Sequence, residues 1–243
     1  IRDENGKKMS KSLGNSPDPI ELFDKYGVDA VRVSILMIAP QGTDVLFSID
    51  RLEQGRNFMN KLWNSSRFLM MNIDDISSIK NINKINFQEL EAIDFWILSK
   101  LNKTINLVDT QLSNYKLNEA IKTIYNFVWR DYCDWYIEFS KNRMYGNNLK
   151  EKELNISVAV HVLKTILKLL HPYAPFITEE IWSFFKRSNE NILVKTQWPA
   201  VDTKLINSNI EEELNFIMNV ISAIRNIRSE LNVSPKKEAE LIC

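Results

Sequence analysis

The chain has 243 residues, 44% of them hydrophobic and 26% charged, as is typical of a globular protein that buries a sizeable core. Its 31 basic residues balance its 31 acidic ones, so no whole-chain field attracts nucleic acid, and any such site must be a local patch. The two cysteines, Cys133 and Cys243, exclude a disulfide scaffold and predict a cytoplasmic protein, and no apolar run is long enough to span a bilayer.

The first part of the chain predicts a polar loop at 1–16 followed by a mixed segment. The pattern DPIELFDKYG at 18–27 is typical of a short helix that ends at Gly27. The apolar run at 28–39 fits two structures, because its β-branched residues favour a strand while its spacing permits a buried helix. Residues 39–48 predict a loop that leads into a short extended piece.

From about residue 50 the pattern becomes helical, because apolar residues recur at spacings of three and four. A short strand is expected at Ile192–Trp198 and another after the turn at Pro235. With only 6 glycines and 7 prolines, the predicted fold class is mainly α: a helix bundle preceded by a small mixed α/β connecting segment. Both ends read as though cut from a longer protein. The expected helices lie near 50–72, 88–112, 116–144, 151–171, 174–187 and 209–231.

The segment GKKMSKSLGN at 6–15 is the one stretch whose composition alone points to chemistry. Between its two glycines it alternates cations and hydroxyls: Lys7, Lys8, Ser10, Lys11 and Ser12. Such groups on a short turn suit the oxygens of a phosphate, and Gly14 lets the backbone come close to them. A solvated basic turn has the same composition, so the residues alone leave both interpretations open.

The expected helix around 56–72 has an unusual polar face. At about 100° per residue, Phe58, Leu62 and Leu69 share the core side. Amide edges, a cation and a ring plane are what single-stranded bases and their phosphates require, and the opposite arc offers all three. The alternative is that a neighbouring element covers Phe68, and the pattern does not decide between the two. The arc consists of Asn57, Asn60, Lys61, Asn64, Phe68 and Met71.

A stripe of aromatic residues at helical spacing follows in 127–141, and it favours bundle core over a binding platform. Its members are Trp129, Tyr132, Trp135, Tyr136 and Phe139. Asp134 or Arg130 is expected to be buried and paired, because each lies between aromatic residues. No histidine or cysteine stands at ligand spacing beside the carboxylates, so no metal site is expected.

The later helices carry few groups that suggest chemistry. His161 and His171 are expected to be structural, because no nucleophile motif lies near them. Arg225 and Arg228 are three residues apart on one helix face, free to meet either phosphates or water.

Taken in series, these segments resemble the class I aminoacyl-tRNA synthetases. KMSKS at 8–12 is similar to the second signature of that class, and DPIELFDKYGVDAVR resembles its group for valine, isoleucine and leucine. Five further segments together resemble the valyl-tRNA synthetase family: GTDVLF, GRNFMNKLWNSSRFL, CDWYIE, LLHPYAPFITEEIW and IRNIRSELNVSP. The resemblance covers nearly the whole chain. The other signature of the class, HIGH, does not occur in it, nor do the amino-acid pocket and the editing domain.

The resemblance implies four parts. Residues 1–16 would end a Rossmann-type catalytic domain and carry the KMSKS loop, and 17–55 would be the stem-contact connecting segment. Residues 56–235 would be the anticodon-binding helical bundle, and 236–243 would start a truncated following segment. It also implies the reaction of a valine–tRNA ligase: valine is activated with ATP and Mg²⁺, releasing pyrophosphate, and then passes to tRNA(Val).

The family's residue roles carry over to matching positions. Lys8 and Lys11 would be catalytic, stabilising charge on the transferring phosphates. The ATP-binding residues would be Lys8, Met9, Ser10, Lys11 and Ser12. The tRNA-binding residues would be Asn57, Asn60, Lys61, Asn64 and Phe68, with Phe68 stacked on an anticodon base.

The chain by itself is expected to be inactive and to bind no cofactor tightly, and no membrane partner is expected. Two alternatives stay open. One is a fragment of an isoleucyl- or leucyl-tRNA synthetase, against which the segments GTDVLF and GRNFMNKLWN argue. The other is a non-enzymatic helical interaction module, against which the phosphate-binding loop argues.

Overall fold

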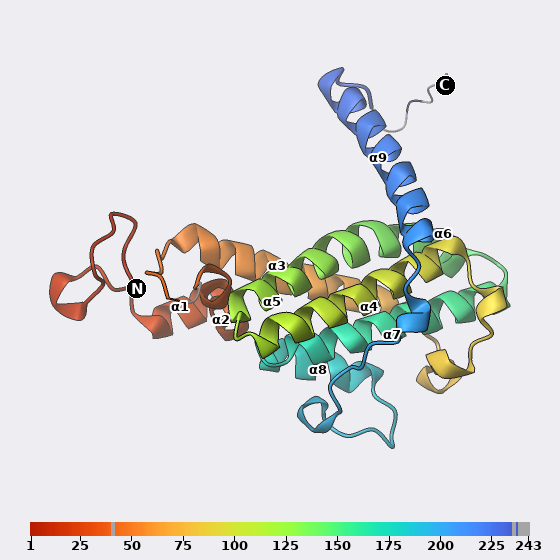
Figure 1. Cartoon of the computed structure of the whole chain (residues 1–243), viewed down its shortest axis with the longest axis horizontal. Helices are drawn as coiled ribbons and strands as arrows, with labels where there is room; N and C mark the ends of the chain where they lie inside the picture. Colours follow the sequence, from red (N-terminus) through yellow and green to blue (C-terminus); the bar gives the residue numbers. More distant parts are fainter. Residues whose placement is uncertain (40–41, 235–236, 238–243) are drawn as a thin grey trace.

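The structure is a computed structural model that describes residues 1–39, 42–234 and 237. Within these residues the only β pairings are isolated bridges from Arg2 to Lys8 and to Leu46. Figure 1 shows a long bundle of helices with the opening loop at one end and the last helix projecting near the other. The expected mainly α fold is therefore confirmed, and the only β pairing that reaches the connecting segment 17–55 within the described residues is the bridge at Leu46.

The helices begin and end close to the expected residues. The first are α1 (Pro19–Tyr26), α2 (Val28–Ile38), α3 (Ile49–Met70) and α4 (Ala92–Ser113). They continue with α5 (Leu117–Asn126), a π-helix (Phe127–Tyr136), α6 (Ile137–Tyr145), α7 (Leu149–Leu170), α8 (Pro175–Phe185) and α9 (Ser208–Glu230). Short 3-10 turns lie at Lys11–Leu13, Ile76–Ser78, Ile82–Lys84, Phe87–Glu89, Leu193–Lys195 and Thr203–Leu205.

The strand expected at Ile192–Trp198 was a wrong prediction. A 3-10 turn, Leu193–Lys195, occupies this stretch. The backbone N–H of Leu193 donates to both carboxylate oxygens of Glu179, at 3.0 and 3.1 Å, so a side chain on α8 satisfies the donor that a strand partner would have taken. The strand expected after Pro235 lies outside the described residues, apart from Lys237.

The ambiguous run at 28–39 forms helix α2, and its tight packing against α3 explains why. A Cβ added to Gly55 of α3 would lie 2.4 Å from the carbonyl oxygen of Ala30 and 2.2 Å from the hydroxyl of Ser34. The two helix backbones therefore approach to a distance that only glycine permits. Helix α3 is continuous from Ile49 to Met70, so it crosses the expected boundary at residue 55 without a break.

Two contacts fasten the front of the chain to the bundle. The Asp29 carboxylate on α2 accepts the backbone N–H of Ile177 on α8 at 2.7 Å. Nearby, the Arg32 guanidinium donates to the carbonyl oxygens of Pro172 and Tyr173, each at 3.2 Å. Burial raises the pKa of Asp29, which the Ile177 N–H and Arg32 partly offset. These contacts join α2 to α8 and to the corner that precedes it.

The bundle core contains a buried polar network around Asp94. Asp94 on α4 is fully buried and forms a bidentate pair with Arg143 on α6, at 2.6 and 2.8 Å. The Tyr136 hydroxyl donates to Asp94 at 2.9 Å, and the Asn155 amide on α7 contacts Tyr136 at 3.3 Å. The network thus joins α4, the π-helix, α6 and α7, and it specifies how these elements meet.

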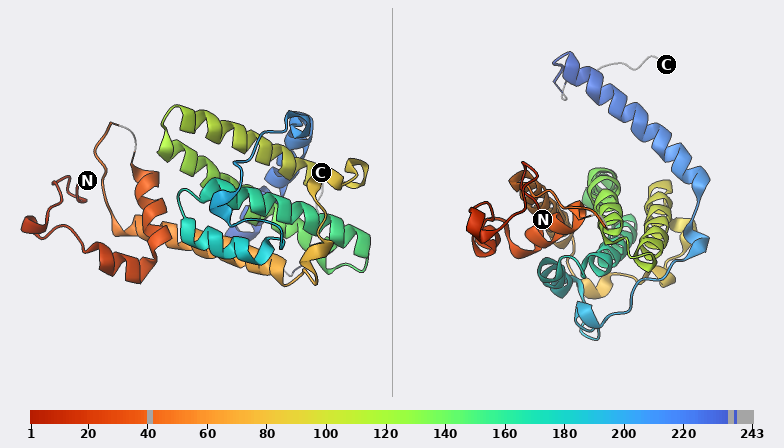
Figure 2. Two further views of the ribbon diagram at one scale, coloured as in Figure 1. Left: turned by 90° about the horizontal axis from the view of Figure 1, so that it is seen from below. Right: turned by 60° about the vertical axis from the view of Figure 1, so that its left-hand side comes forward.

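The firmest contacts of helix α9 with the bundle lie in its first half. The Ser99 hydroxyl on α4 donates to the buried Glu211 carboxylate, and Lys103 pairs with Glu211 at 3.0 Å. Glu211 and Met218 are the only buried residues of this helix. Figure 2 shows the result from two further sides: α9 leans away from the bundle, and the opening loop lies toward the opposite end of the long axis.

Candidate nucleic-acid interface

The polar arc expected on α3 is present. Asn57, Asn60 and Asn64 are exposed, and none of their side-chain amides has a hydrogen-bond partner within the described residues. Met71 beside them is 75% exposed, whereas Phe58, Leu62 and Leu69 on the other side are fully buried, as expected. The sequence-predicted residues Asn57, Asn60, Lys61, Asn64 and Phe68 are called the α3 face below.

Lys61 is the charged member of the α3 face, and its side chain has two partners. It forms an ion pair with the Asp134 carboxylate, and its ammonium lies 3.8 Å from the centre of the Trp129 ring. Both partners belong to the π-helix. The expectation that Asp134 or Arg130 is buried was wrong: Arg130 is exposed, and the Asp134 side chain is 48% exposed although it is paired.

Phe68 is half-buried, which lies between the two alternatives that the sequence left open. Its ring packs against the core and meets the Tyr145 ring edge-on, with centroids 6.0 Å apart and planes at 85°. The Lys141 ammonium lies 5.9 Å from its centroid. The ring is therefore held at the edge of the α3 face and only part of it faces outward.

The aromatic stripe divides into two sets, so the prediction of a core role was right for only part of it. Tyr132 and Tyr136 are fully buried. Trp129, Trp135 and Phe139 are half-buried, and Trp135 and Phe139 stack on each other with centroids 5.7 Å apart. Part of the stripe thus borders the surface, where rings held by neighbours can contact a ligand.

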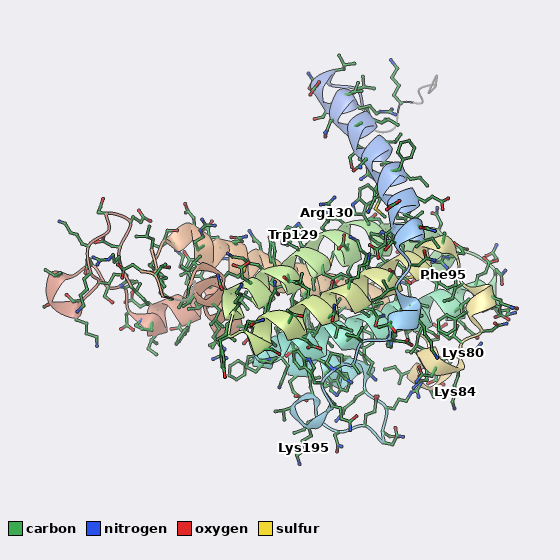
Figure 3. The ribbon with its side chains drawn as sticks, in the orientation of Figure 1. Lys80, Lys84, Phe95, Trp129, Arg130 and Lys195 are labelled. Carbon is green, nitrogen blue, oxygen red and sulfur yellow. The ribbon has the colours of Figure 1, made fainter. Side chains whose placement is uncertain are left out.

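A polar cleft of about 540 Å³ lies where the middle of α9 meets α4 and the π-helix, and the sequence did not predict it. Its lining includes Lys100 of α4, Arg130 of the π-helix and three asparagines: Asn126, Asn215 and Asn219. Figure 3 shows Trp129 and Arg130 on the side of the bundle from which α9 projects. Because the lining comes from separate segments, no local pattern could have indicated it.

Arg225 of α9 extends this polar region toward the half-buried rings. Its guanidinium lies 5.5 Å from the centre of the Trp135 ring. The sequence left open whether Arg225 meets phosphates or only water, and the structure adds an aromatic ring as a neighbour. Arg228 instead donates to the carbonyl oxygens of Ser234 and Lys237.

The opening loop presents its lysines outward. Asn15 links two parts of the loop: its side-chain amide donates to Asp3 at 2.8 Å, and its side-chain carbonyl accepts the Ser10 N–H at 3.0 Å. Met9 packs against a small second core made of Tyr26, Val31, Phe47 and Leu52. Gly14 has a φ of 66°, a left-handed conformation that favours glycine, and it ends the 3-10 turn there.

The lysines and serines of the opening loop are at least partly exposed. Lys8, Lys11 and Ser12 are exposed, and neither lysine is ion-paired within the described residues. The hydroxyls of Ser10 and Ser12 lie 3.1 Å apart. The Asn15 hydrogen bond is the main cause of a lowered pKa at Asp3, so this carboxylate is kept ionised in a role that supports the loop. The loop and the α3 face are not brought together.

Other sequence-predicted groups have structural surroundings. The His171 ring lies 2.8 Å from the Thr178 hydroxyl. Cys133 is a free, buried cysteine whose pKa burial raises to about 11. No helix among the described residues has the length and apolar character needed to cross a membrane.

Curated relatives match over the whole chain. A valine–tRNA ligase of Fusobacterium nucleatum is 45% identical, with 100% of this chain covered and 27% of the relative. A valine–tRNA ligase of Thermotoga maritima is 40% identical, with 99% and 27% covered. The chain thus spans about 27% of the length of these relatives.

Solved structures share the fold. The ternary complex of Agrobacterium radiobacter K84 agnB2 LeuRS with tRNA and LeuAMS matches with a TM-score of 0.64 at 22% identity, covering 84% of this chain and 23% of that one. Mycobacterium tuberculosis methionyl-tRNA synthetase with methionyl-adenylate matches with a TM-score of 0.60 at 21% identity, covering 74% and 36%.

Two family descriptions match the sequence directly. Residues 1–48, which contain the opening loop, match "tRNA synthetases class I (I, L, M and V)". Residues 94–243, more than half of the chain, match "Anticodon-binding domain of tRNA ligase". The chain therefore belongs to the family of anticodon-binding domains of tRNA ligases.

Proposed function

We propose that this chain is the tRNA-binding part of a valine–tRNA ligase and that its α3 face contacts the anticodon loop of tRNA(Val). The observation that carries the proposal is the set of three exposed amides without partners, beside a lysine and a ring that neighbouring elements hold in place. Relatives called valine–tRNA ligase, 40–45% identical over nearly the whole chain, support the choice of valine.

The physical argument rests on what unpaired bases need. Asn57, Asn60 and Asn64 each present a donor and an acceptor that can pair with base edges. The exposed part of the Phe68 ring can stack on a base, because every base has an aromatic plane. Lys61 supplies positive charge near the backbone, and its contacts with Trp129 and Asp134 limit the entropy that it loses on binding.

The opening loop would serve the ligation chemistry within the longer enzyme. Lys8 and Lys11 would stabilise the negative charge that develops on the phosphates of ATP, while Met9, Ser10 and Ser12 shape the loop and bind the nucleotide. The exposed lysines and the left-handed turn at Gly14 support this role. Mg²⁺ would accompany ATP, and no residue of this chain is assigned to it.

The proposed division of the chain follows from these roles. Residues 1–16 belong to the catalytic domain, 17–55 connect it to the bundle, 56–235 form the anticodon-binding bundle, and 236–243 begin a further segment. The chain alone does not activate valine and holds no cofactor tightly, because the rest of the ATP site lies elsewhere in the ligase. The full enzyme acts in the cytoplasm.

The test is binding of this chain to valine tRNA and to isoleucine tRNA, side by side, over a salt series. We expect a preference for valine tRNA that persists as salt rises, because base contacts release few counterions whereas phosphate contacts release many. Equal and steeply salt-dependent binding to both would contradict base recognition by the α3 face. A preference for isoleucine tRNA would favour the isoleucine ligase instead.

A further inference from the structure

A second cleft, of about 310 Å³, lies away from both sites described above. It opens between α7, α8 and the turns at Ile76–Ser78 and Ile82–Lys84. Figure 3 shows Lys80 and Lys84 on the opposite side of the bundle from Trp129 and Arg130. Its lining is mixed: apolar side chains, with Trp182 and Phe185 among them, alternate with neutral polar groups and with lysine and arginine side chains.

The cleft carries more positive charge than the chain as a whole would suggest. Four cations line it: Lys80, Lys164, Lys168 and Arg187. The only carboxylate in the lining is Glu190. Because the complete chain is neutral, with 31 basic and 31 acidic residues, this surplus is a local concentration of charge.

Glu190 is already fully engaged. Its two oxygens accept hydrogen bonds from the Lys164 ammonium at 2.7 and 2.6 Å, and one of them also accepts the Arg187 N–H at 2.7 Å. Lys164 is further held over the Trp182 ring, 4.6 Å from its centre. The one carboxylate is thus in direct contact with Lys164, and one negative charge faces four positive ones in the lining.

Lys80 and Lys168 have no direct ion-pair partner within the described residues, and Glu190 acts on the charge of Lys168 only from a distance. Lys168 is half-buried, and burial followed by the nearby Lys164 lowers its pKa, so the fold bears a cost to keep this cation in place. An anion in the cleft would remove that cost and gain charge-assisted hydrogen bonds.

We propose that this cleft binds a phosphate group, carried either by a free phosphorylated molecule or by the backbone of RNA, with Lys80 and Lys168 as its two main contacts. Phosphate fits because it offers several oxygens to cations that approach from different sides, here from a turn and from α7. The inference stands apart from the proposed function, since no residue of the cleft belongs to the α3 face or to the opening loop.

The test is calorimetric titration of the chain with inorganic pyrophosphate at fixed ionic strength. To exclude the opening loop, the chain carries Lys8→Ala and Lys11→Ala throughout. We expect saturable binding that weakens about tenfold or more with Lys168→Gln and with Lys80→Ala, because each removes a charge-assisted contact. Lys195→Ala is the matched control: Lys195 is an exposed lysine of the turn Leu193–Lys195 and does not line the cleft.

Several outcomes decide whether the cleft binds phosphate and from which source. Absence of saturable binding, or equal weakening by Lys195→Ala, would overturn the proposal. Lys80 lies on an exposed turn, so its variant tests the site even if Lys168→Gln disturbs folding. Adding tRNA then separates the two sources. If tRNA displaces pyrophosphate, and Lys80→Ala abolishes this displacement, the phosphate belongs to the RNA backbone. If tRNA binds without displacing pyrophosphate, the ligand is a free phosphorylated molecule.

Discussion

The ammonium of Lys61 on α3 lies 3.8 Å from the centre of the Trp129 ring and at the same time pairs with Asp134. These two partners are five residues apart. In an α-helix, at about 100° per residue, they would point about 140° away from each other. In the π-helix each backbone N–H bonds the carbonyl oxygen five residues earlier, so residues five apart lie close to the same side. Trp129 and Asp134 can therefore both contact Lys61. This local change of helix type thus positions the cation of the α3 face.

The first prediction concerns the charge of that lysine. Lys61→Met keeps the apolar stem against Trp129 but removes the cation. We expect weaker tRNA binding, measured by titration over a salt series. The slope of the logarithm of affinity against the logarithm of salt concentration should fall in magnitude by about 1. The free energy of unfolding should change by less than about 1 kcal/mol, because the pair is partly exposed. Lys122→Met removes another ion-paired lysine, on α5, and should leave tRNA binding unchanged.

The second prediction concerns the ring of Phe68. Phe68→Leu keeps most of the apolar volume beside Tyr145 but removes the plane on which a base stacks. Affinity for valine tRNA should fall by about 1–3 kcal/mol, as measured by the dissociation constant at fixed salt. The control is Phe184→Leu, because Phe184 is also partly exposed and meets Trp63 edge-on. Equal affinities for both variants would remove Phe68 from the interface.

The third prediction concerns the opening loop in the full-length ligase. Lys11→Ala should lower the rate of valine activation by the equivalent of roughly 3–4 kcal/mol while affecting ATP affinity much less. The reason is that charge on the phosphates is greatest in the transition state. Pyrophosphate exchange gives both quantities. Lys7→Ala is the matched control, and equal losses of rate and affinity in Lys11→Ala would contradict the assigned role.

The fourth prediction concerns the buried pair of Asp94 and Arg143. Arg143→Met leaves a fully buried carboxylate without its cation and should destabilise the chain by about 3–5 kcal/mol in urea unfolding. Adding Asp94→Asn should recover part of this loss, since the orphaned charge is then gone. If Arg143→Met alone is as stable as the parent, water or another group replaces Arg143 and the prediction is wrong.

The fifth prediction concerns pH and His161. Burial, then Lys168 and Lys164, lowers the pKa of His161 to about 4 from an ordinary value of 6.5. Between these values the unfolded chain binds a proton that the folded chain does not, so stability falls as pH drops through this window. The loss of stability caused by His161 is absent above pH 6.5 and reaches about 3 kcal/mol below pH 4. Urea unfolding at several pH values gives the free energy of unfolding as a function of pH. This free energy should fall less steeply between pH 6.5 and pH 4 in His161→Gln than in the parent.

Much of this architecture was predictable from the sequence, because it depends on local order. Apolar residues at spacings of three and four determined the long helices from α3 to α9. The alternating lysines and serines of the opening loop, with Gly14 after them, indicated an anion site, and the polar arc of α3 could be counted at 100° per residue. In each case the information lies within one short segment.

Tertiary structure decided what depends on neighbours from distant segments. The run at 28–39 became a helix because it packs on Gly55, and Leu193 lies in a turn because Glu179 takes its N–H. Phe68 is half-buried because Tyr145 lies against it. The aromatic stripe divided because a π-helix changed its period, and the cationic cleft arose where a turn, α7 and α8 meet. A single segment's periodicity contains no information about which other segment will lie against it, and burial and pairing depend on that contact.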